Sequence, residues 1–355
     1  MKIFHCDHCQ QLVYFENTRC VNCGRTLAFL PDLFELGSLD RHESGRWSSA
    51  NAYAQGRMYR LCQNYAVESV CNWAIPADST ELYCESCRLT RVIPNLNQTG
   101  NKKAWAKMET AKRRLIYSVL ALGLPLTSRA HDPTHGLAFE FLADPPHHTP
   151  NPILTGHAQG LITINLSEAN DAERERRRLE LGEPYRTLLG HFRHESGHYY
   201  WDRLIDRSPR LDPFRVLFGD ERENYGEALK RHYRNGARPN WPDRFITAYA
   251  SSHPWEDWAE SWAHYLHMAD TLETAAACGL ALQPRRADEP LLPNSSEIFR
   301  NRGATFDDMI AAWFPLTHVL NNLNRGLGLS DGYPFIVSAP AVEKLRFIHD
   351  TIHGE

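Results

Sequence analysis

The stretch His194-Glu195-Ser196-Gly197-His198 governs how the rest of this chain is interpreted. It lies within residues 183–205, which we predict to form one helix. Positions four apart share a face of a helix, so His194 and His198 can offer imidazole nitrogens to one metal ion, with Glu195 beside it. Zinc held by two histidines and one further protein ligand keeps a position for water. The alternative is a surface helix that carries two histidines by chance.

A third ligand must come from elsewhere, and residues 252–277 are predicted to form the helix that supplies it. Glu256, Glu260 and His264 are four apart and therefore share one face of this tryptophan-rich segment. Carboxylates are costly to bury unless something positive lies opposite, and a zinc ion with two imidazoles is such a partner. We predict Glu256 as the ligand and Glu260 as the acceptor that orients a ligand histidine. The reversed roles, and His264 or Asp257 as the ligand, stay open at this point.

Eight of the nine cysteines form two quartets with the spacing of metal ligands. The first has two C-x-x-C pairs separated by ten residues, as in a zinc ribbon. The second is looser, with one C-x-x-C pair preceded by two cysteines nine positions apart. We predict a structural zinc ion in each quartet, so that the full expectation is two structural ions and one catalytic ion. The first quartet is Cys6, Cys9, Cys20 and Cys23, and the second is Cys62, Cys71, Cys84 and Cys87.

Such short cysteine regions cannot bury a sufficient core, so the metal must supply folding free energy on the order of 10 kcal/mol. Disulfides would need an oxidising compartment, and a redox C-x-x-C normally accompanies a βαβ pattern that is missing here. We interpret the quartets as metal staples that brace the N-terminal region. Readers of protein or nucleic acid are the alternative, although residues 6–24 carry no basic stripe. The remaining cysteine, Cys278, is expected to pack in the core.

Length and composition favour one large globular domain with a smaller appendage. The chain has 355 residues, 42% of them hydrophobic, and a net charge of -4. No basic field of the kind that drives nucleic-acid binding is present, so nucleic acid is not an expected partner. Residues 1–6 lack an apolar leader, and the longest apolar run, 115–126, is too short to span a bilayer. We therefore expect a cytoplasmic protein without a membrane association and leave its oligomeric state open.

The segment pattern predicts an α+β protein whose main domain is mostly helical with a small sheet. Residues 95–103 form a polar linker, which places the main boundary there. The expected domains are a zinc ribbon at 1–32, a second four-cysteine region at 33–98, and a large domain at 99–355. Residues 40–59 look like a polar connection between the two cysteine regions. In the large domain we expect helices at 105–122 and 220–235, in addition to those above, and strands at 137–142 and 160–166.

The motif H-E-x-x-H, followed downstream by a helix of the form E-x-x-A-E at Glu256–Glu260, resembles the gluzincin metallopeptidases. More specifically, residues 194–204 (HESGHYYWDRL) and 253–267 (HPWEDWAESWAHYLH) resemble the bacterial family described as putative zinc-binding metallopeptidases. Residues 84–94 (CESCRLTRVIP) resemble the N-terminal zinc-ribbon region of the same family. The resemblance covers nearly the whole chain and implies a zincin-like fold with Glu256 as the third zinc ligand. In some gluzincins a tyrosine seven residues before that ligand stabilises the oxyanion, and Tyr249 stands there, with His253 and His264 as competitors.

The leading hypothesis is therefore zinc-dependent hydrolysis of a peptide or isopeptide bond in a peptide or protein substrate. Glu195 would accept a proton from water and pass it to the leaving amine, and Tyr249 would donate to the oxyanion. The strand at 160–166 is expected to be an edge strand that pairs with an extended substrate. Two alternatives remain. The zincin domain could be a catalytically silent scaffold, against which the intact Glu195 argues, or the ribbons could be the primary binding region, with cleavage in a regulatory role.

Overall fold

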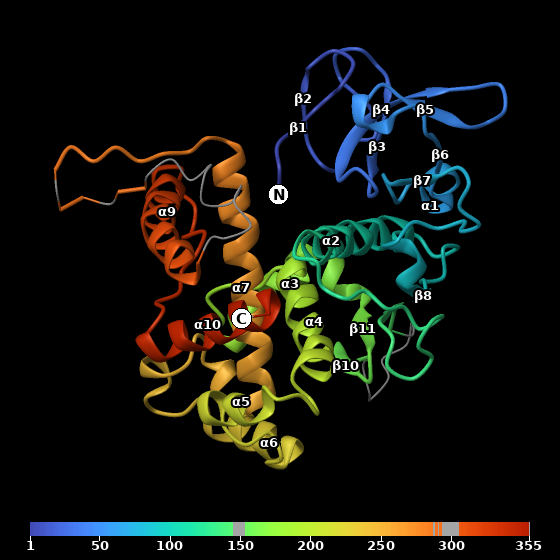
Figure 1. Cartoon of the computed structure of the whole chain (residues 1–355). Coiled ribbons are helices and arrows are strands. Elements are labelled where there is room, and N and C mark those ends of the chain that lie inside the picture. The colour runs from blue at the N-terminus through green and yellow to red at the C-terminus, as the bar shows by residue number, and fades with distance from the viewer. Residues whose placement is uncertain (145–152, 287, 290, 293–304, 355) are drawn as a thin grey trace.

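A computed structural model describes residues 1–144, 153–286, 288–289, 291–292 and 305–354. The protein mixes helices and small sheets, with the strands of residues 4–76 gathered at one end and most helices at the other (Figure 1). Helix α2 (Asn101–Ala121) lies between these two parts. None of the helices in the described ranges is both long and apolar enough to cross a membrane.

The N-terminal part contains two antiparallel sheets. Strands β1 (Phe4–His5) and β2 (Leu12–Val13) form a short hairpin beside the first cysteine pair. The next five strands form one sheet in chain order: β3 (Thr26–Leu30), β4 (Glu35–Arg41), β5 (Trp47–Ser49), β6 (Met58–Leu61) and β7 (Ala74–Pro76). Residues 40–59, expected to be a polar connection, do join the two cysteine regions, but they form part of this sheet. That segment holds β5 and the ends of its neighbours, and all three residues of β5 are only partly buried.

A third sheet, of four strands, supports the motif helix. Its order is β10 (Gly156–Ala158), β11 (Leu161–Asn165), β9 (Ala138–Leu142) and β8 (Thr90–Val92). Strand β10 is antiparallel to β11, and the other pairs are parallel. The segment predicted as an edge strand, 160–166, is β11, which lies between two strands, so that prediction was wrong. Its alternate residues Ile162 and Ile164 are fully buried, and its backbone pairs with β10 on one side and β9 on the other.

Helices form the rest of the chain. After the short η3 (Leu166–Ala169), Asn170 caps α3 (Asp171–Leu181), and Gly182 ends it with a φ of 65°. The motif helix α4 (Leu188–Leu204) begins where Thr187 accepts a hydrogen bond from the backbone of Gly190. The single helix predicted over 183–205 thus begins at Leu188, five residues after the predicted start. The described helices that follow are α5 (Leu211–Phe218), α6 (Tyr225–Asn235), η4 (Trp241–Asp243), η5 (Tyr249–Ser251), α7 (Pro254–Ala277), α9 (Phe306–Gly326) and α10 (Ala339–His353).

Two helix starts show how capping decides the boundaries. The helix predicted from Asp220 begins at Tyr225 instead, because the side chain of Asn224 accepts from the backbone of Glu227. The predicted start of α7 is confirmed: His253 is the cap, and Pro254 follows at the first helical position. These boundaries place the start of α6 and the start of α7 next to each other, as the site below requires.

Candidate metal centres

Helices α4 and α7 pack unusually close to each other at the motif. A Cβ added to Gly197 would lie 2.9 Å from the Cα of Ala259 and 3.2 Å from the Cβ of Trp262. Trp258 Nε1 donates to the carbonyl of Gly197 at 2.8 Å, and Trp262 Nε1 donates to Ser196 Oγ at 3.2 Å. The two small residues inside the motif therefore let α7 approach. This contact brings the histidines of α4 opposite the carboxylates of α7.

His194, His198 and Glu256 meet at this crossing. One potential ligand atom from each lies within 4.8 Å of the others. His194 Nε2 is 3.0 Å from Glu256 Oε2, and His198 Nε2 is 3.6 Å from Glu256 Oε1. Burial would raise the pKa of Glu256, but His198 and His194 beside it hold that pKa well below its usual value. Glu256 Oε2 is buried and accepts no hydrogen bond from the described residues, so the donor set fits a cation.

Glu260, one turn further along α7, contacts the far side of His194. His194 Nδ1 is 2.7 Å from Glu260 Oε1, and Thr247 Oγ1 donates to Glu260 Oε2 at 2.8 Å. A carboxylate on Nδ1 fixes the ring orientation and leaves Nε2 to face a metal. The structure thus places Glu260 where it orients His194, with Glu256 on the other nitrogen. Thr247 was not noted in the sequence, where nothing distinguishes it from other threonines.

Glu195 follows His194 directly on α4 and is 8% exposed. Its Oε2 atom is buried and has no hydrogen-bond partner among the described residues. A buried, unbonded carboxylate oxygen is costly unless a ligand or water satisfies it. Glu195 thus places an unsatisfied carboxylate oxygen on the helix that carries His194 and His198.

The candidate electrophiles lie at different places. The ring of Tyr249 is 6.0 Å from the ring of His194. His253 caps α7, where its Nδ1 accepts from the backbone of Trp255 at 3.1 Å. His264 Nδ1 lies 2.8 Å from the hydroxyl of Tyr333, and burial lowers the pKa of His264 to about 4. Tyr249 is therefore the one of these three that contacts a ligand histidine in the described structure.

Two further residues at the site, Tyr225 and His157, were not predicted from the sequence. The hydroxyl of Tyr225, at the start of α6, donates to Glu256 Oε1 at 2.6 Å. On the edge strand β10, the ring of His157 stacks on the ring of His198 at 6.1 Å. Burial, followed by the charges of His198 and Arg129, lowers the pKa of His157 to about 3, so this ring stays neutral. Neither residue has a sequence signal, because each reaches the site only through tertiary packing.

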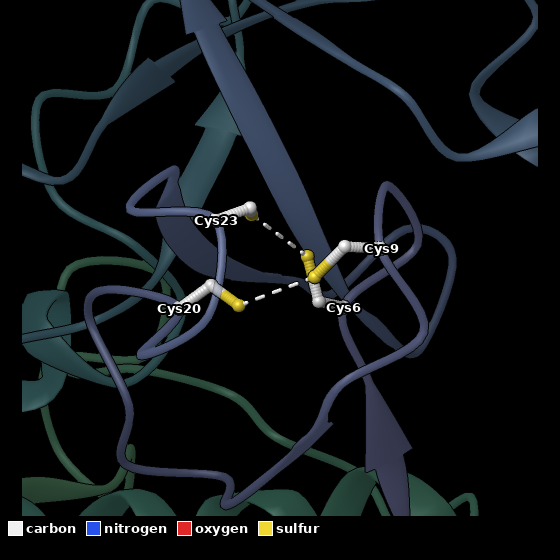
Figure 2. A group of neighbouring side chains, drawn as sticks. All are labelled: Cys6, Cys9, Cys20 and Cys23. Carbon is white, nitrogen blue, oxygen red and sulfur yellow. Dashed lines mark hydrogen bonds between the residues drawn. The ribbon is translucent and has the colours of Figure 1, made fainter.

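The first cysteine quartet converges from two tight turns (Figure 2). Cys6 Sγ is 3.7 Å from Cys23 Sγ, and Cys9 Sγ is 3.6 Å from Cys20 Sγ. Each turn closes with a backbone bond across four residues, from Gln10 to Cys6 and from Gly24 to Cys20. The left-handed φ of Gly24, 73°, explains a glycine at that position. Four sulfurs so arranged fit one tetrahedral zinc ion.

The second quartet also converges, although its first two cysteines are nine residues apart. Cys71 Sγ is 3.8 Å from Cys84 Sγ, and the four sulfurs lie within 4.8 Å of one another. Backbone N–H groups point at three of these sulfurs, from Trp73 to Cys71, from Cys84 to Cys62 and from Cys87 to Cys84. Such donors stabilise thiolates. The leftover cysteine, Cys278, is exposed, so its predicted core position was wrong: it lies just beyond the end of α7.

These features define a zinc-binding protein of mixed helix and sheet, with two cysteine sites ahead of a histidine–glutamate centre. Residues 101–351 match the family described as "Putative zinc-binding metallo-peptidase", and residues 3–98 match a zinc-ribbon domain. The chain belongs to this metallopeptidase family, as its resemblance predicted. Uncharacterized proteins of Mycobacterium bovis and of two Mycobacterium tuberculosis strains are 42% identical over 353 residues, covering 99% of this chain and 95% of theirs. No solved structure matches the chain.

Proposed function

We propose that this protein is a zinc-dependent peptidase that hydrolyses peptide or isopeptide bonds at a zincin-like site. The observation that carries the proposal is the convergence of His194, His198 and Glu256 beside the unbonded carboxylate of Glu195. A site that served structure alone would need no free carboxylate next to its ligands. Zinc bound there would polarise the substrate carbonyl and lower the pKa of a water molecule.

The chain's own residues supply the proton transfers and the orientation. Glu195 accepts the proton of the attacking water through Oε2 and delivers it to the leaving amine. Glu260 keeps His194 Nδ1 occupied, so that the imidazole presents Nε2. Tyr249, beside the His194 ring, is the proposed donor to the carbonyl oxygen, a contribution typically worth about 3 kcal/mol.

Substrate binding is assigned to β10 in place of the strand first expected. Within the described residues, β10 pairs on one side only, with β11. His157, in the middle of β10, stacks on His198, so the strand runs beside the ligand histidines. An extended peptide paired with β10 would be held through its main chain, which suits substrates of varied sequence.

The cysteine sites are proposed to hold two structural zinc ions, for a total of three per chain. Their thiols must stay reduced, which agrees with a proposed cytoplasmic location. The partner of the protein is then its peptide or protein substrate, and neither the quartets nor the described helices supply a reason to add nucleic acid or a membrane.

The experiment compares the wild-type protein with Glu195→Gln on a diverse peptide pool and on a whole-lysate protein pool. We expect cleavage products from the wild type and a loss of about 100-fold or more in rate for the variant, because the general base is removed. Metal analysis is the control, since the substitution leaves all proposed ligands in place and zinc content should not change. Identical products from both proteins would overturn the enzyme assignment.

A further inference from the structure

The two carboxylate oxygens of Glu256 have different partners. Oε1 accepts a hydrogen bond from the hydroxyl of Tyr225 at 2.6 Å. Oε2 lies 3.0 Å from His194 Nε2 and accepts no hydrogen bond from the described residues. Glu256 itself is 1% exposed. Tyr225 therefore engages Oε1, which also lies 3.6 Å from His198 Nε2, and leaves Oε2 without a hydrogen bond beside His194.

We propose that Tyr225 is a positioning residue that makes Glu256 bind the metal through one oxygen only. The proposal rests on the metal centre proposed above and adds a residue to it. A carboxylate can bind a metal through one or both oxygens, and a catalytic zinc site must keep a position for water or substrate. A charge-assisted hydrogen bond on Oε1 opposes binding through both oxygens. Tyr225 thus acts through Glu256, without itself touching the substrate.

The start of α6 is built to hold this hydroxyl in place. Asn224 caps the helix by accepting from the backbone of Glu227 at 3.0 Å. His253 Nδ1 accepts from the backbone of Trp255, so its other nitrogen, Nε2, carries the proton and donates to the carbonyl of Glu223 at 3.0 Å. The cap of α7 is thereby tied to the residues that precede Tyr225.

Aromatic packing fixes the Tyr225 ring in the same way. Its centroid is 5.2 Å from the ring of His253 and 5.9 Å from that of Trp255, both at the start of α7. Glu256 is the next residue of α7, so the tyrosine and the carboxylate that it contacts are held by the same turn. Replacing the hydroxyl alone leaves these ring contacts intact, which makes Tyr225→Phe a conservative variant.

Tyr249 provides the matched control. It is also a tyrosine at the site, but its ring packs against those of His194 and His232, at 6.0 and 5.8 Å, and no contact joins its hydroxyl to Glu256 among the described hydrogen bonds. If any missing hydroxyl near the centre disturbed the metal, Tyr249→Phe would have the effect of Tyr225→Phe. If the bond to Oε1 is the cause, only Tyr225→Phe should act.

The test measures the metal directly in the full-length protein. Zinc affinity of the histidine centre is determined by competition with a chromophoric chelator for the wild type, Tyr225→Phe and Tyr249→Phe. We expect Tyr225→Phe to weaken zinc binding by 10- to 100-fold, the usual effect of removing a partner of a ligand. Tyr249→Phe should change it less than threefold. Retention of zinc in the two cysteine sites shows that each variant is folded.

Cobalt replaces zinc for a second reading, since its visible absorption reports coordination geometry. The spectrum of His194→Ala, which keeps the cysteine sites, is subtracted from the spectrum of each protein. The difference then reports the histidine centre alone. We expect Tyr225→Phe to shift and weaken the cobalt bands as Glu256 binds through both oxygens, and Tyr249→Phe to match the wild type. Unchanged affinity and spectrum in Tyr225→Phe, even with reduced turnover, would overturn the positioning role. Normal metal content in His194→Ala would instead overturn the metal centre itself.

Discussion

In the first four-cysteine site Cys9 and Cys23 are partly exposed, whereas all four cysteines of the second site are buried. The first site is built from residues 6–23 and lies beside the β1–β2 hairpin. The second site contacts the large domain: Cys87 Sγ lies 3.9 Å from Glu109 Oε2 on α2. The first site is thus closed by residues 6–23, which reach α2 through Phe15 and Glu16, whereas a cysteine of the second site contacts α2 directly.

The charges around the second site follow from this burial. A zinc ion with four thiolates carries two negative charges, which are costly to bury without a positive neighbour. Arg113 on α2 is buried there, and its NH1 atom donates to the carbonyl of Val70 at 2.6 Å. Burial lowers the pKa of Arg113. The negative charges of Cys71, Glu109, Cys87 and Cys84 raise it by more, so the pKa lies above its usual value. The second site and α2 therefore depend on each other.

The comparison predicts unequal effects when each site loses a ligand. Cys84→Ser should destabilise the second site and, through α2, the whole large domain. Structural zinc contributes on the order of 10 kcal/mol, comparable to the entire stability of a typical domain, so this variant should be largely unfolded. Cys9→Ser should disturb mainly the N-terminal hairpin region, because its contacts with α2, such as Phe15 on Tyr117, are made by side chains other than the cysteines. Zinc content and thermal unfolding, followed by tryptophan fluorescence, measure both.

Each variant should lose one zinc ion, which makes them matched controls for one another. The large domain has most of the tryptophans, among them Trp258, Trp262 and Trp313, so fluorescence reports mainly on it. Equal loss of the main unfolding transition in both variants would contradict the distinction between the two sites.

A smaller effect tests the charge that links the second site to α2. Arg113→Met removes the buried cation while keeping most of its volume, and should reduce the free energy of unfolding by about 3 kcal/mol, as for other broken buried pairs. The adjacent Arg114 is the control: it bonds Glu16 at 2.6 Å but is 43% exposed. Arg114→Met should lose less than about 1 kcal/mol. Urea unfolding of both variants measures the difference, and equal losses would count against a role for burial.

The sequence predicts which residues converge in these three clusters far better than it predicts their surroundings. Both quartets and the His194–His198–Glu256 set are visible because ligand chemistry demands particular residues at fixed spacing. The burial of the second quartet against α2 is not visible, since Arg113 reads as part of a basic run, Lys112-Arg113-Arg114. Only the folded structure shows that Arg113 and Lys112 are buried and Arg114 is not.

The order of strands in a sheet and the first residue of a helix also depend on tertiary contacts, which a sequence does not show. The alternation of β11 indicates a strand but not its neighbours, so its interior position could not be inferred. The close approach at Gly197 had a signal, two small residues within the motif, that could have been used. Tyr225 had none, because its contact with Glu256 joins residues 31 positions apart on different helices.

The smallest expected effect is the pH dependence contributed by His267. It tests whether the second cysteine site unfolds together with the large domain. His267 on α7 packs against Tyr185 and Tyr333, and burial, with Arg193 and His264, lowers its pKa to about 3. In the unfolded chain its pKa is about 6.5. Below pH 6.5 the unfolded state therefore binds a proton at His267, whereas the folded state does not. The free energy of unfolding falls as the pH drops toward 3.

Between pH 7.5 and 5.5 this one group should remove roughly 1 kcal/mol from the free energy of unfolding. His267→Phe keeps the aromatic packing without the proton, so the wild type should lose about that much more than the variant over this range. Acid also weakens zinc binding, but equally in both proteins, and the difference between them isolates His267. If the second site and the large domain form one unit, zinc release from that site should shift with the same pH difference. Release from the first site should shift less, because the start of the chain meets α7 through Met1, whose amino group donates to the Asp270 carbonyl at 2.9 Å, and not through the cysteines themselves.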